Sequence, residues 1–377
     1  MRIGIEAQRI FRKKKHGMDM VALELVKHIP EVDTKNEYVV FVKEDEDKAC
    51  LSSFANVEVQ VLPGASYPVW EQWILPKAAK NAKVDLLHCT SNTAPIFPGM
   101  PLVITLHDII YLEKLHFKEG TAYQRFGNLY RRWNVPAVVK KAAKIITVSE
   151  FEKNRICEHF GFDTNQVTAV YNGVSRHFQR VTDAGLLKEA RQKYHLPEKF
   201  LFFLGNTDPK KNVAGVLKAL SILKSRNQLP YKLLMLDINR EYLQRVAGEI
   251  GDLSILDEIT FTGYVPNKDL PAIYSQAELF LYPSLRESFG IPMIEAMRCG
   301  VPVITSTTSC MPEVAGGAAL LCDPFDAEAM ANSIIDLLNN QTKREELVKL
   351  GLERSQKFSW VENARQTIDI YHQILKA

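Results

Sequence analysis

The sequence predicts an α/β protein built from two doubly wound, Rossmann-like domains with a ligand cleft between them. Short apolar runs rich in Val, Ile and Phe alternate with longer amphipathic segments along the whole chain. Continuous apolar runs suit parallel strands that are buried on both faces, and amphipathic helices suit the crossovers between them. The length of 377 residues also exceeds what one hydrophobic core usually serves. Two domains of this class account for both the pattern and the length.

The expected strands fall into two groups. The first group contains RIGIEA, YVVFVK, VEVQVL, LLHCTS, LVITLHD and IITVSE, and the second contains FLFFLGN, KLLMLD, ITFTGYV, LFLYPS, VPVITST and AALLCDP. Residues 175–200, which separate the groups, are polar and include Gly185 and Pro197. We therefore expect a boundary near residue 180, with one domain over residues 1–180 and the other over residues 181–358. The alternative is that much of this stretch is a surface helix of the second domain.

Composition narrows the class of protein without naming a function. The chain is 46% hydrophobic and 24% charged, as is ordinary for a globular protein, and its formal charge of +3 is too small to indicate nucleic-acid binding. Its start predicts no signal peptide, and no apolar run has transmembrane length. The six cysteines are scattered without the close pairs of a zinc site, which favours reduced thiols in a cytoplasmic protein. The acidic run at residues 43–48 is expected to be a solvated turn.

The segment FLFFLGNTDPKKN reads as a strand, a loop and the start of a helix. Gly205 ends the strand, and Lys210, Lys211 and Asn212 open the helix. Free amides and ammonium groups at a helix start suit a diphosphate. The alternative is a solvated helix start capped by Asn212 or Asp208. No G-x-G-x-x-G or P-loop pattern is present in the sequence, which counts against a nicotinamide cofactor and against an ordinary nucleoside triphosphatase.

The decapeptide ESFGIPMIEA places two carboxylates in a segment that is otherwise apolar. Glu287 follows the strand LFLYPS in a loop, Pro292 suits the first turn of the next helix, and Glu295 lies about two turns into it. A buried acid is costly unless hydrogen bonds satisfy it, and a ribose diol offers two matching hydroxyl donors. The alternative is that one glutamate caps the helix and the other pairs with Arg286 or Arg298.

Two further candidates lie in the first domain. His107 and Asp108 end the strand LVITLHD, where a histidine can hydrogen-bond a ligand, transfer a proton or be a satisfied structural residue. A basic loop and Gly17 precede the amphipathic helix in FRKKKHGMDMVALELV, which makes a second anion site plausible.

Residues 123–144, YQRFGNLYRRWNVPAVVKKAAK, combine basic and aromatic side chains. Such a face suits peripheral contact with anionic lipid. The alternative is a helix that covers the sheet and turns a charged face outward.

Residues 261–324, which begin FTGYVPNKDLPAIY and end AALLCDP, strongly resemble the second domain of the family 4 retaining nucleotide-sugar glycosyltransferases, which have the GT-B fold. The signature of that family is two glutamates with seven residues between them, matched by Glu287 and Glu295. The motifs ITLHD, ITVSEFEKNRI, VYNGV and DPKKN also have counterparts, so the resemblance spans nearly the whole chain. The bacterial mannosyltransferase-like branch, which builds surface polysaccharides such as lipopolysaccharide, is the most similar.

The resemblance implies roles for residues of the second, donor-binding domain. Glu287 would contact the transferred sugar, Glu295 would hold the ribose, and Lys211 would bind the diphosphate. The backbone of Phe289, Gly290 and Ile291 would run along the sugar and diphosphate. Many relatives have an arginine after the glycine that corresponds to Gly205; this chain has Asn206 instead, so Lys210 is expected to supply the second positive charge.

For the first, acceptor-side domain the resemblance implies that His107 contacts the donor sugar near its reacting carbon. Gly17 and Asp108 would belong to loops that approach the phosphate and the acceptor, and the helix at 359–377 would cross back to this domain. Many relatives have paired glycines in the loop where this chain has Gly17 alone.

The resemblance thus implies a retaining, metal-independent hexosyltransferase with no cofactor other than its nucleotide-sugar substrate. The expected reaction transfers mannose from GDP-mannose, or a hexose from a UDP-hexose, to a hydroxyl of a glycan or lipid-linked oligosaccharide at the inner face of the cell membrane. The leaving phosphate is expected to deprotonate the incoming hydroxyl. The alternatives are a GT-B epimerase or hydrolase of nucleotide sugars and a catalytically silent nucleotide-sugar-binding partner.

Overall fold

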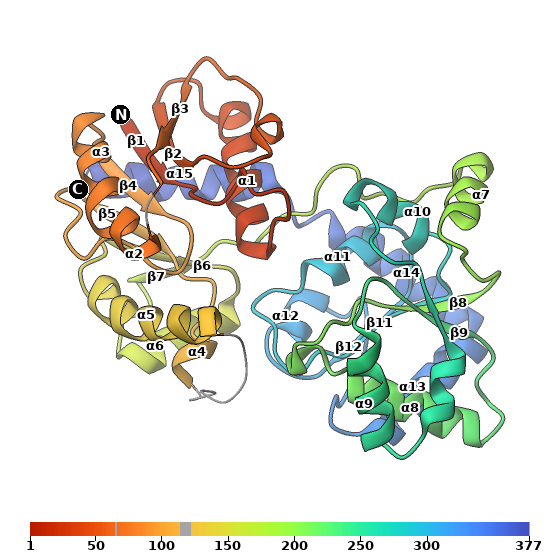
Figure 1. The fold of residues 1–377 in the computed structure, drawn as a ribbon. Coiled ribbons are helices and arrows are strands. Elements are labelled where there is room, and N and C mark those ends of the chain that lie inside the picture. Colours follow the sequence, from red (N-terminus) through yellow and green to blue (C-terminus); the bar gives the residue numbers. More distant parts are fainter. Residues whose placement is uncertain (65, 114–121, 377) are drawn as a thin grey trace. The chain divides into compact units, whose positions relative to one another are not determined.

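The computed structural model describes residues 1–64, 66–113 and 122–376, and the chain divides into two units (Figure 1). The first unit contains Met1–Gly173 and Ser359–Ala377, and the second contains Val174–Phe358. The second unit thus begins before the boundary expected near residue 180. The reason is that Phe178 is fully buried and packs edge-on against Tyr274, with 6.1 Å between the ring centroids. Each unit is described by itself.

The first unit contains a parallel sheet of seven strands in the order β3-β2-β1-β4-β5-β6-β7. The strands are β1 (Arg2–Glu6), β2 (Glu37–Lys43), β3 (Val57–Leu62), β4 (Leu86–Cys89), β5 (Leu102–Thr105), β6 (Lys144–Thr147) and β7 (Val167–Ala169). Each of the six expected runs contains a strand. The seventh strand, β7, was not predicted because it has only three residues and no long apolar run. The expectation of strands buried on both faces is wrong for β3. It is an edge strand, and the side chains of Val59 and Val61 are exposed.

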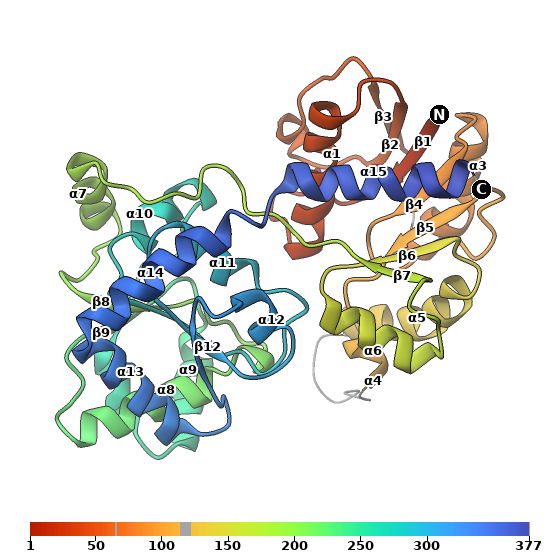
Figure 2. The same cartoon turned by 180° about the vertical axis from the view of Figure 1, so that it is seen from behind.

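Helices cover both faces of the first sheet. They are α1 (Gly17–Val32), α2 (Tyr67–Val69), α3 (Leu75–Asn81), α4 (Ile110–Glu113), α5 (Ala122–Val139), α6 (Glu150–Phe160) and α15 (Trp360–Lys376), with a 3₁₀ turn η1 (Lys48–Cys50) and a π turn η2 (Trp70–Ile74). Helices α1 and α15 pack on one face, and α3, α5 and α6 pack on the other (Figure 2). The hydroxyl of Tyr371 on α15 lies 2.6 Å from Nδ1 of His88, which ties the C-terminal helix to β4.

The second unit contains a parallel sheet of six strands in the order β10-β9-β8-β11-β12-β13. The strands are β8 (Phe200–Phe203), β9 (Lys232–Met235), β10 (Ile259–Phe261), β11 (Leu279–Tyr282), β12 (Val303–Ser306) and β13 (Leu320–Cys322). The helices are α7 (Ala184–Lys193), α8 (Val213–Ser225), α9 (Arg240–Glu249), α10 (Leu270–Tyr274), α11 (Ile291–Arg298), α12 (Met311–Ala315), α13 (Ala327–Asn339) and α14 (Gln341–Ser355), with 3₁₀ turns η3 (Pro209–Lys211), η4 (Leu253–Glu258) and η5 (Asn267–Asp269).

The two faces of the second sheet differ in the side chains that cover them. Helices α8, α9 and α13 pack aliphatic side chains against one face. The other face carries a cluster of buried aromatic rings in edge-on, tilted and stacked contacts, which we call the aromatic cluster: Phe178, Phe202, Tyr274, Phe280 and Tyr282.

Both sheets have the doubly wound arrangement predicted from the sequence, in which the strand order reverses next to the first strand. The reversal lies between β1 and β4 in the first unit and between β8 and β11 in the second. Ligands of open α/β sheets bind outside the carboxyl ends of the strands at this switch point. Each unit therefore has one place where a site is expected.

Candidate functional site

Three loops meet at the switch point of the second unit. They follow β8, β11 and β12 at the carboxyl ends of these strands. The backbone N–H of Leu285 donates to the carbonyl of Lys210 at 2.8 Å, which joins the first loop to the second. The hydroxyl of Thr308 donates to the carbonyls of Ser284 and Leu285, which joins the third loop to the second. Hydrogen bonds to backbone carbonyls thus hold the three loops together.

Lys211 and Glu287 form an ion pair at the centre of these loops. Nζ of Lys211 lies 2.6 Å from Oε1 of Glu287, and the two side chains are only 15% and 11% exposed. The same ammonium donates to the hydroxyl of Tyr282 at 3.0 Å and lies 4.9 Å from the centroid of its ring. The sequence left open that Glu287 pairs with the Arg286 guanidinium. In the structure the Glu287 carboxylate pairs with Lys211. Nη1 of Arg286 instead donates to the backbone carbonyl of Glu287.

Asn212, the residue after Lys211, has a left-handed backbone conformation and a side chain with several hydrogen bonds. Its φ of 60° lies in the left-handed region, and its side-chain oxygen accepts from Gly215 as the N-cap of α8. Its side-chain amide donates to the carbonyls of Pro283 and Pro324 at 3.1 and 2.7 Å. The sequence indicated the cap but not these two bonds, which fasten the loop of Lys211 to the loop after β11, which carries Glu287, and to the loop after β13.

The two other predicted residues of the lysine loop have different surroundings. Nζ of Lys210 lies 3.5 Å from Asp208, and its side chain is 40% exposed, so it is more open to solvent than Lys211. A Cβ atom at Gly205 would lie 2.4 Å from the ring of Phe203, so a larger residue there would displace this buried ring.

Glu295 lies on the second turn of α11, as the sequence predicts. Burial raises the pKa of its carboxyl to about 8, although part of the side chain remains accessible. Its hydroxyl partner is Tyr274, at a long distance of 3.4 Å. The negative charges of Glu287 and Glu295 both contribute to raising the pKa of Tyr282, after the larger effect of burial.

A tight turn at Gly290 joins the loop of Glu287 to the start of α11. Gly290 has a φ of 88°, and a Cβ atom there would also press on the Met311 side chain at 3.2 Å. Phe289 is buried against Phe358, and Ile291 begins the helix. This geometry leaves the backbone of residues 289–291 beside Glu287.

The residues that sequence reasoning missed are the ones that hold Glu287 in place. Tyr282 ends β11, the hydroxyl of Ser309 accepts from the Glu287 N–H at 3.2 Å, and the thiol of Cys310 donates to the Glu287 carbonyl at 3.2 Å. The one signal for these residues in the sequence was the hydroxyl of Tyr282, the only polar group on a side chain of β11, at the end of the strand.

In the first unit His107 is a buried residue with hydrogen bonds to the backbone. Its Nε2 donates to the carbonyl of Thr90 at 2.9 Å, and its backbone N–H donates to the Asn92 side chain at 2.6 Å. Burial lowers the pKa of His107, which favours the neutral imidazole. Asp108 accepts from the N–H of Ile110. These contacts fit the alternative of a structural histidine, and its role toward the donor sugar remains a prediction.

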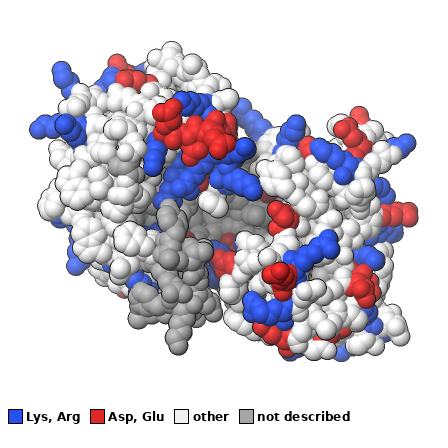
Figure 3. All heavy atoms as spheres, in the orientation of Figure 1, with Lys and Arg blue, Asp and Glu red and all other residues white. Residues whose placement is uncertain are grey.

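Gly17 is the first residue of α1, next to a basic loop whose charges are paired with acids. Lys13 lies 3.2 Å from Glu46, and Lys15 lies 2.5 Å from Asp47. Figure 3 shows basic and acidic side chains side by side on this face of the first unit. Residues 44–46 are exposed between β2 and η1, as expected of a solvated turn, and two acids of this stretch, Glu46 and Asp47, also pair with the basic loop. These ion pairs also weaken the positive charge that the loop would offer to an anion.

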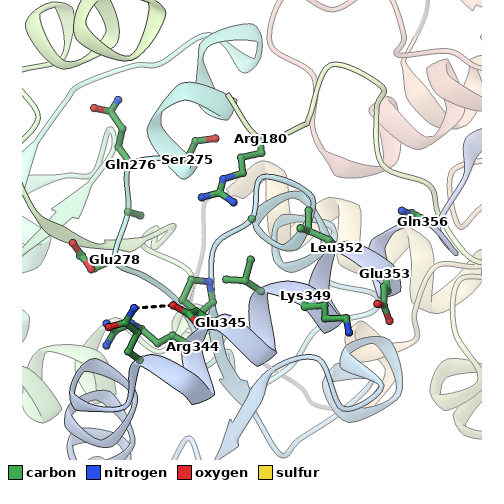
Figure 4. A pocket seen from close by; sticks show the side chains of 15 residues that line it. Arg180, Ser275, Gln276, Glu278, Arg344, Glu345, Lys349, Leu352, Glu353 and Gln356 are labelled. Atoms are coloured by element: carbon green, nitrogen blue, oxygen red, sulfur yellow. Dashed lines mark hydrogen bonds between the residues drawn. The ribbon is translucent and has the colours of Figure 1, made fainter. Parts of the chain in front are cut away.

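A separate cavity of about 750 Å³ lies at the opposite edge of the second sheet (Figure 4). Glu278 and Pro302, which immediately precede β11 and β12, line it together with Arg180 and residues of α14. It faces the amino ends of these strands, whereas Lys211 and Glu287 follow carboxyl ends.

In the described part of the chain, no group of three or more His, Cys, Asp or Glu side chains is arranged to hold a metal ion. None of the helices in residues 1–64, 66–113 and 122–376 is long and apolar enough to cross a membrane.

Comparison with known proteins gives matches in both units. The family described as "Glycosyltransferase Family 4" matches residues 16–178, and the family described as "Glycosyl transferases group 1" matches residues 188–354. The "O-antigen chain mannosyltransferase B" of Escherichia coli is 33% identical over 273 residues, which cover 71% of this chain and 69% of that protein. The "serotype-specific mannosyltransferase WbdA" of Escherichia coli is 28% identical over 73% of this chain, which spans only 34% of that longer protein.

Among solved structures, Anabaena Alr3699/HepE in complex with UDP-glucose is similar in fold. It superposes with a TM-score of 0.74 at 19% identity and covers 99% of this chain and 100% of its own. The fold similarity therefore extends over both units.

Proposed function

Because the chain belongs to glycosyltransferase family 4, we propose that it transfers a hexosyl unit from a nucleotide sugar to a hydroxyl group of a glycan or lipid-linked oligosaccharide. The observation that carries this proposal is the contact of Lys211, Glu287 and Tyr282 at the switch point of the second unit. Mannose from GDP-mannose is the first candidate, since the relatives named above are mannosyltransferases, and a UDP-hexose is the second. The acceptor proposed is a surface polysaccharide or its precursor.

The chemical task is to break the bond between the anomeric carbon of the sugar and the diphosphate. Negative charge grows on the leaving group, and positive charge grows on the sugar ring. Lys211, with Lys210 nearby, would stabilise the leaving diphosphate, and the Glu287 carboxylate would orient the sugar and favour its positive charge. Preorganised charge of this kind is usually the largest single contribution to catalysis. Glu295 would accept hydrogen bonds from the ribose hydroxyls.

We propose that the reaction retains the anomeric configuration and needs no metal ion. The leaving phosphate would then deprotonate the acceptor hydroxyl on the same face of the sugar, and His107 would contact the donor sugar. The test is the stereochemistry of the product, followed by NMR of the anomeric proton. An inverted product would remove the retaining step, and loss of activity in a chelator would remove metal independence.

A catalytically silent nucleotide-sugar binder and a donor-rearranging epimerase or hydrolase are the alternatives. We expect slow donor hydrolysis without acceptor, and we expect Glu287→Ala to abolish it because the variant removes the carboxylate beside the sugar. Transfer to an added glycan acceptor separates a transferase from a hydrolase. A wild-type protein that binds the donor and never turns it over would be a silent binder.

A thermal-shift screen of GDP-mannose, UDP-glucose and other nucleotide sugars would identify the donor. A ligand at a hundred times its dissociation constant stabilises the folded protein by about 2.7 kcal/mol, which is readily measured. If no nucleotide sugar shifts the melting temperature, the proposal fails at its first step.

We also propose that the first unit makes peripheral contact with anionic lipid, which would place the enzyme at the inner face of the cell membrane. The side chains of residues 123–125, within the predicted 123–144 region, lie outside the described residues. Phe126, Leu129 and Trp133 lie three and four residues apart on one face of α5 and are 63%, 55% and 58% exposed. Helix α5 thus exposes large apolar side chains as well as basic ones. This combination supports contact with lipid, and it differs from the purely charged outer face of the alternative.

The test is co-sedimentation with vesicles of phosphatidylcholine that contain phosphatidylglycerol. We expect Phe126→Ser/Trp133→Ser to lose binding, whereas Leu253→Ser, which removes an equally exposed apolar side chain from the second unit, should bind as the wild type does. Absence of wild-type binding, or equal binding by the double variant, would contradict this part of the proposal.

A further inference from the structure

Tyr282 has a place in the site that neither its strand position nor the resemblance assigns. It is the last residue of β11 and only 1% exposed, and its ring stacks on Phe280 within the aromatic cluster, with 5.7 Å between centroids. The ring therefore cannot move without disturbing the core. Its hydroxyl, at the carboxyl edge of the sheet, is a fixed point beneath the ion pair.

The ammonium of Lys211 carries three N–H donors. Among the described residues, Glu287 accepts one of them at 2.6 Å and Tyr282 accepts another at 3.0 Å. Two fixed acceptors determine the rotation of an ammonium group, whereas one acceptor leaves it free to rotate about a single hydrogen bond. The third N–H is then held in one direction, available to a ligand.

The phenol is suited to this task because it stays neutral. Burial and the Glu287 carboxylate raise the pKa of Tyr282 well above its usual value. The oxygen can therefore accept from Lys211 while its proton remains bound, and the tyrosine adds no charge to the site. It orients Lys211 without neutralising the positive charge that a diphosphate requires.

We propose that Tyr282 is a positioning residue that aims the remaining N–H of Lys211 at a diphosphate oxygen of the donor. This inference rests on the proposed function, because it presumes that Lys211 binds the diphosphate. It adds that the geometry of Lys211 is set by an aromatic residue of the core and not by the ion pair alone.

The test compares Tyr282→Phe with Tyr371→Phe. Tyr371 is also a fully buried tyrosine, but its hydroxyl bonds His88 in the first unit and is not part of the Lys211 hydrogen bonds. Both variants lose one buried hydroxyl, so both are expected to lower the melting temperature by a similar amount. Only Tyr282→Phe is expected to weaken binding of GDP or UDP, whichever the wild type binds, by about five- to tenfold in calorimetry. It should also raise the KM for the nucleotide sugar more than it lowers kcat.

A double-mutant cycle decides whether Tyr282 acts through Lys211. In a Lys211→Met background, Tyr282→Phe is expected to cause no further loss of GDP or UDP binding, since the group that it positions is gone. Equal nucleotide affinity of Tyr282→Phe and wild type, or an undiminished further loss in the Lys211→Met background, would overturn the inference and leave the proposed function intact. A wild-type protein that binds neither nucleoside diphosphates nor nucleotide sugars would instead overturn the proposed function itself.

Discussion

The two switch points of this chain have the same topology but different chemistry. In the first unit the carboxylate that ends β1, Glu6, is 1% exposed. Its two oxygens accept from the backbone N–H groups of Gln8 and Thr90, at 2.9 and 3.2 Å. In the second unit the carboxylate at the corresponding edge, Glu287, is paired with Lys211 and remains partly accessible. Backbone donors satisfy one acid, and a lysine side chain pairs with the other.

The difference indicates which acid can serve a ligand. Backbone N–H groups cannot leave Glu6 without unfolding the loop after β4, so this acid is a structural element of the first unit. The ammonium of Lys211 uses one N–H on Glu287 and one on Tyr282, so its third N–H can bind a diphosphate while the ion pair stays in place. We therefore expect the acid that is paired with a side chain, and not the acid held by backbone groups, to belong to a functional site.

The largest effect that would sharpen this comparison is expected for Lys211→Met. The variant removes the positive charge at the leaving diphosphate, so kcat/KM for the nucleotide sugar should fall by about 10²–10³-fold. It also leaves Glu287 without its ion-pair partner. Steady-state kinetics with the donor identified by thermal shift is the measurement, and a loss of less than threefold, roughly, would contradict the role of Lys211.

Glu6→Ala is the matched change at the other switch point and should affect stability instead of turnover. It leaves the N–H groups of Gln8 and Thr90 buried without an acceptor. The free energy of unfolding is expected to fall by about 2–4 kcal/mol. Urea denaturation measures this loss, and kcat/KM per folded molecule should stay within about twofold of wild type. A large loss of turnover in a folded variant would show that the two switch points are less different than proposed.

The smallest effect concerns the pH dependence of stability at Glu295. Because the folded pKa is raised from 4.5 to about 8, the unfolded state loses its proton first. The stability that the protonated carboxyl provides is complete below pH 4.5 and is lost as the pH rises through 8. Glu295→Gln, which cannot ionise, should therefore gain in free energy of unfolding over wild type as the pH rises from 5 to 9, by about 1–2 kcal/mol once the shift is discounted for the accessible part of the side chain. Denaturation at the two pH values is the measurement, and an equal difference at both would be contrary evidence.

Much of the fold could be predicted because its signals are local. Continuous apolar runs marked all six strands of the second sheet and six of the seven in the first. The three-residue strand β7 was missed because it is too short for a periodic pattern, and the exposed side of β3 was missed because an edge position depends on strand order. The boundary at Val174 depends on the burial of Phe178 against Tyr274, a contact between segments almost a hundred residues apart.

The sequence by itself determined the family, the doubly wound architecture and the identities of Lys211, Glu287 and Glu295 as candidates, since these follow from spacing and residue type within short segments. Only the tertiary structure decided their partners. It joined Lys211 to Glu287 across 76 positions of sequence, and it put Tyr282 beneath them. Hydrogen bonds between loops depend on which strands are neighbours in the sheet, and strand order is a property of the whole packed domain.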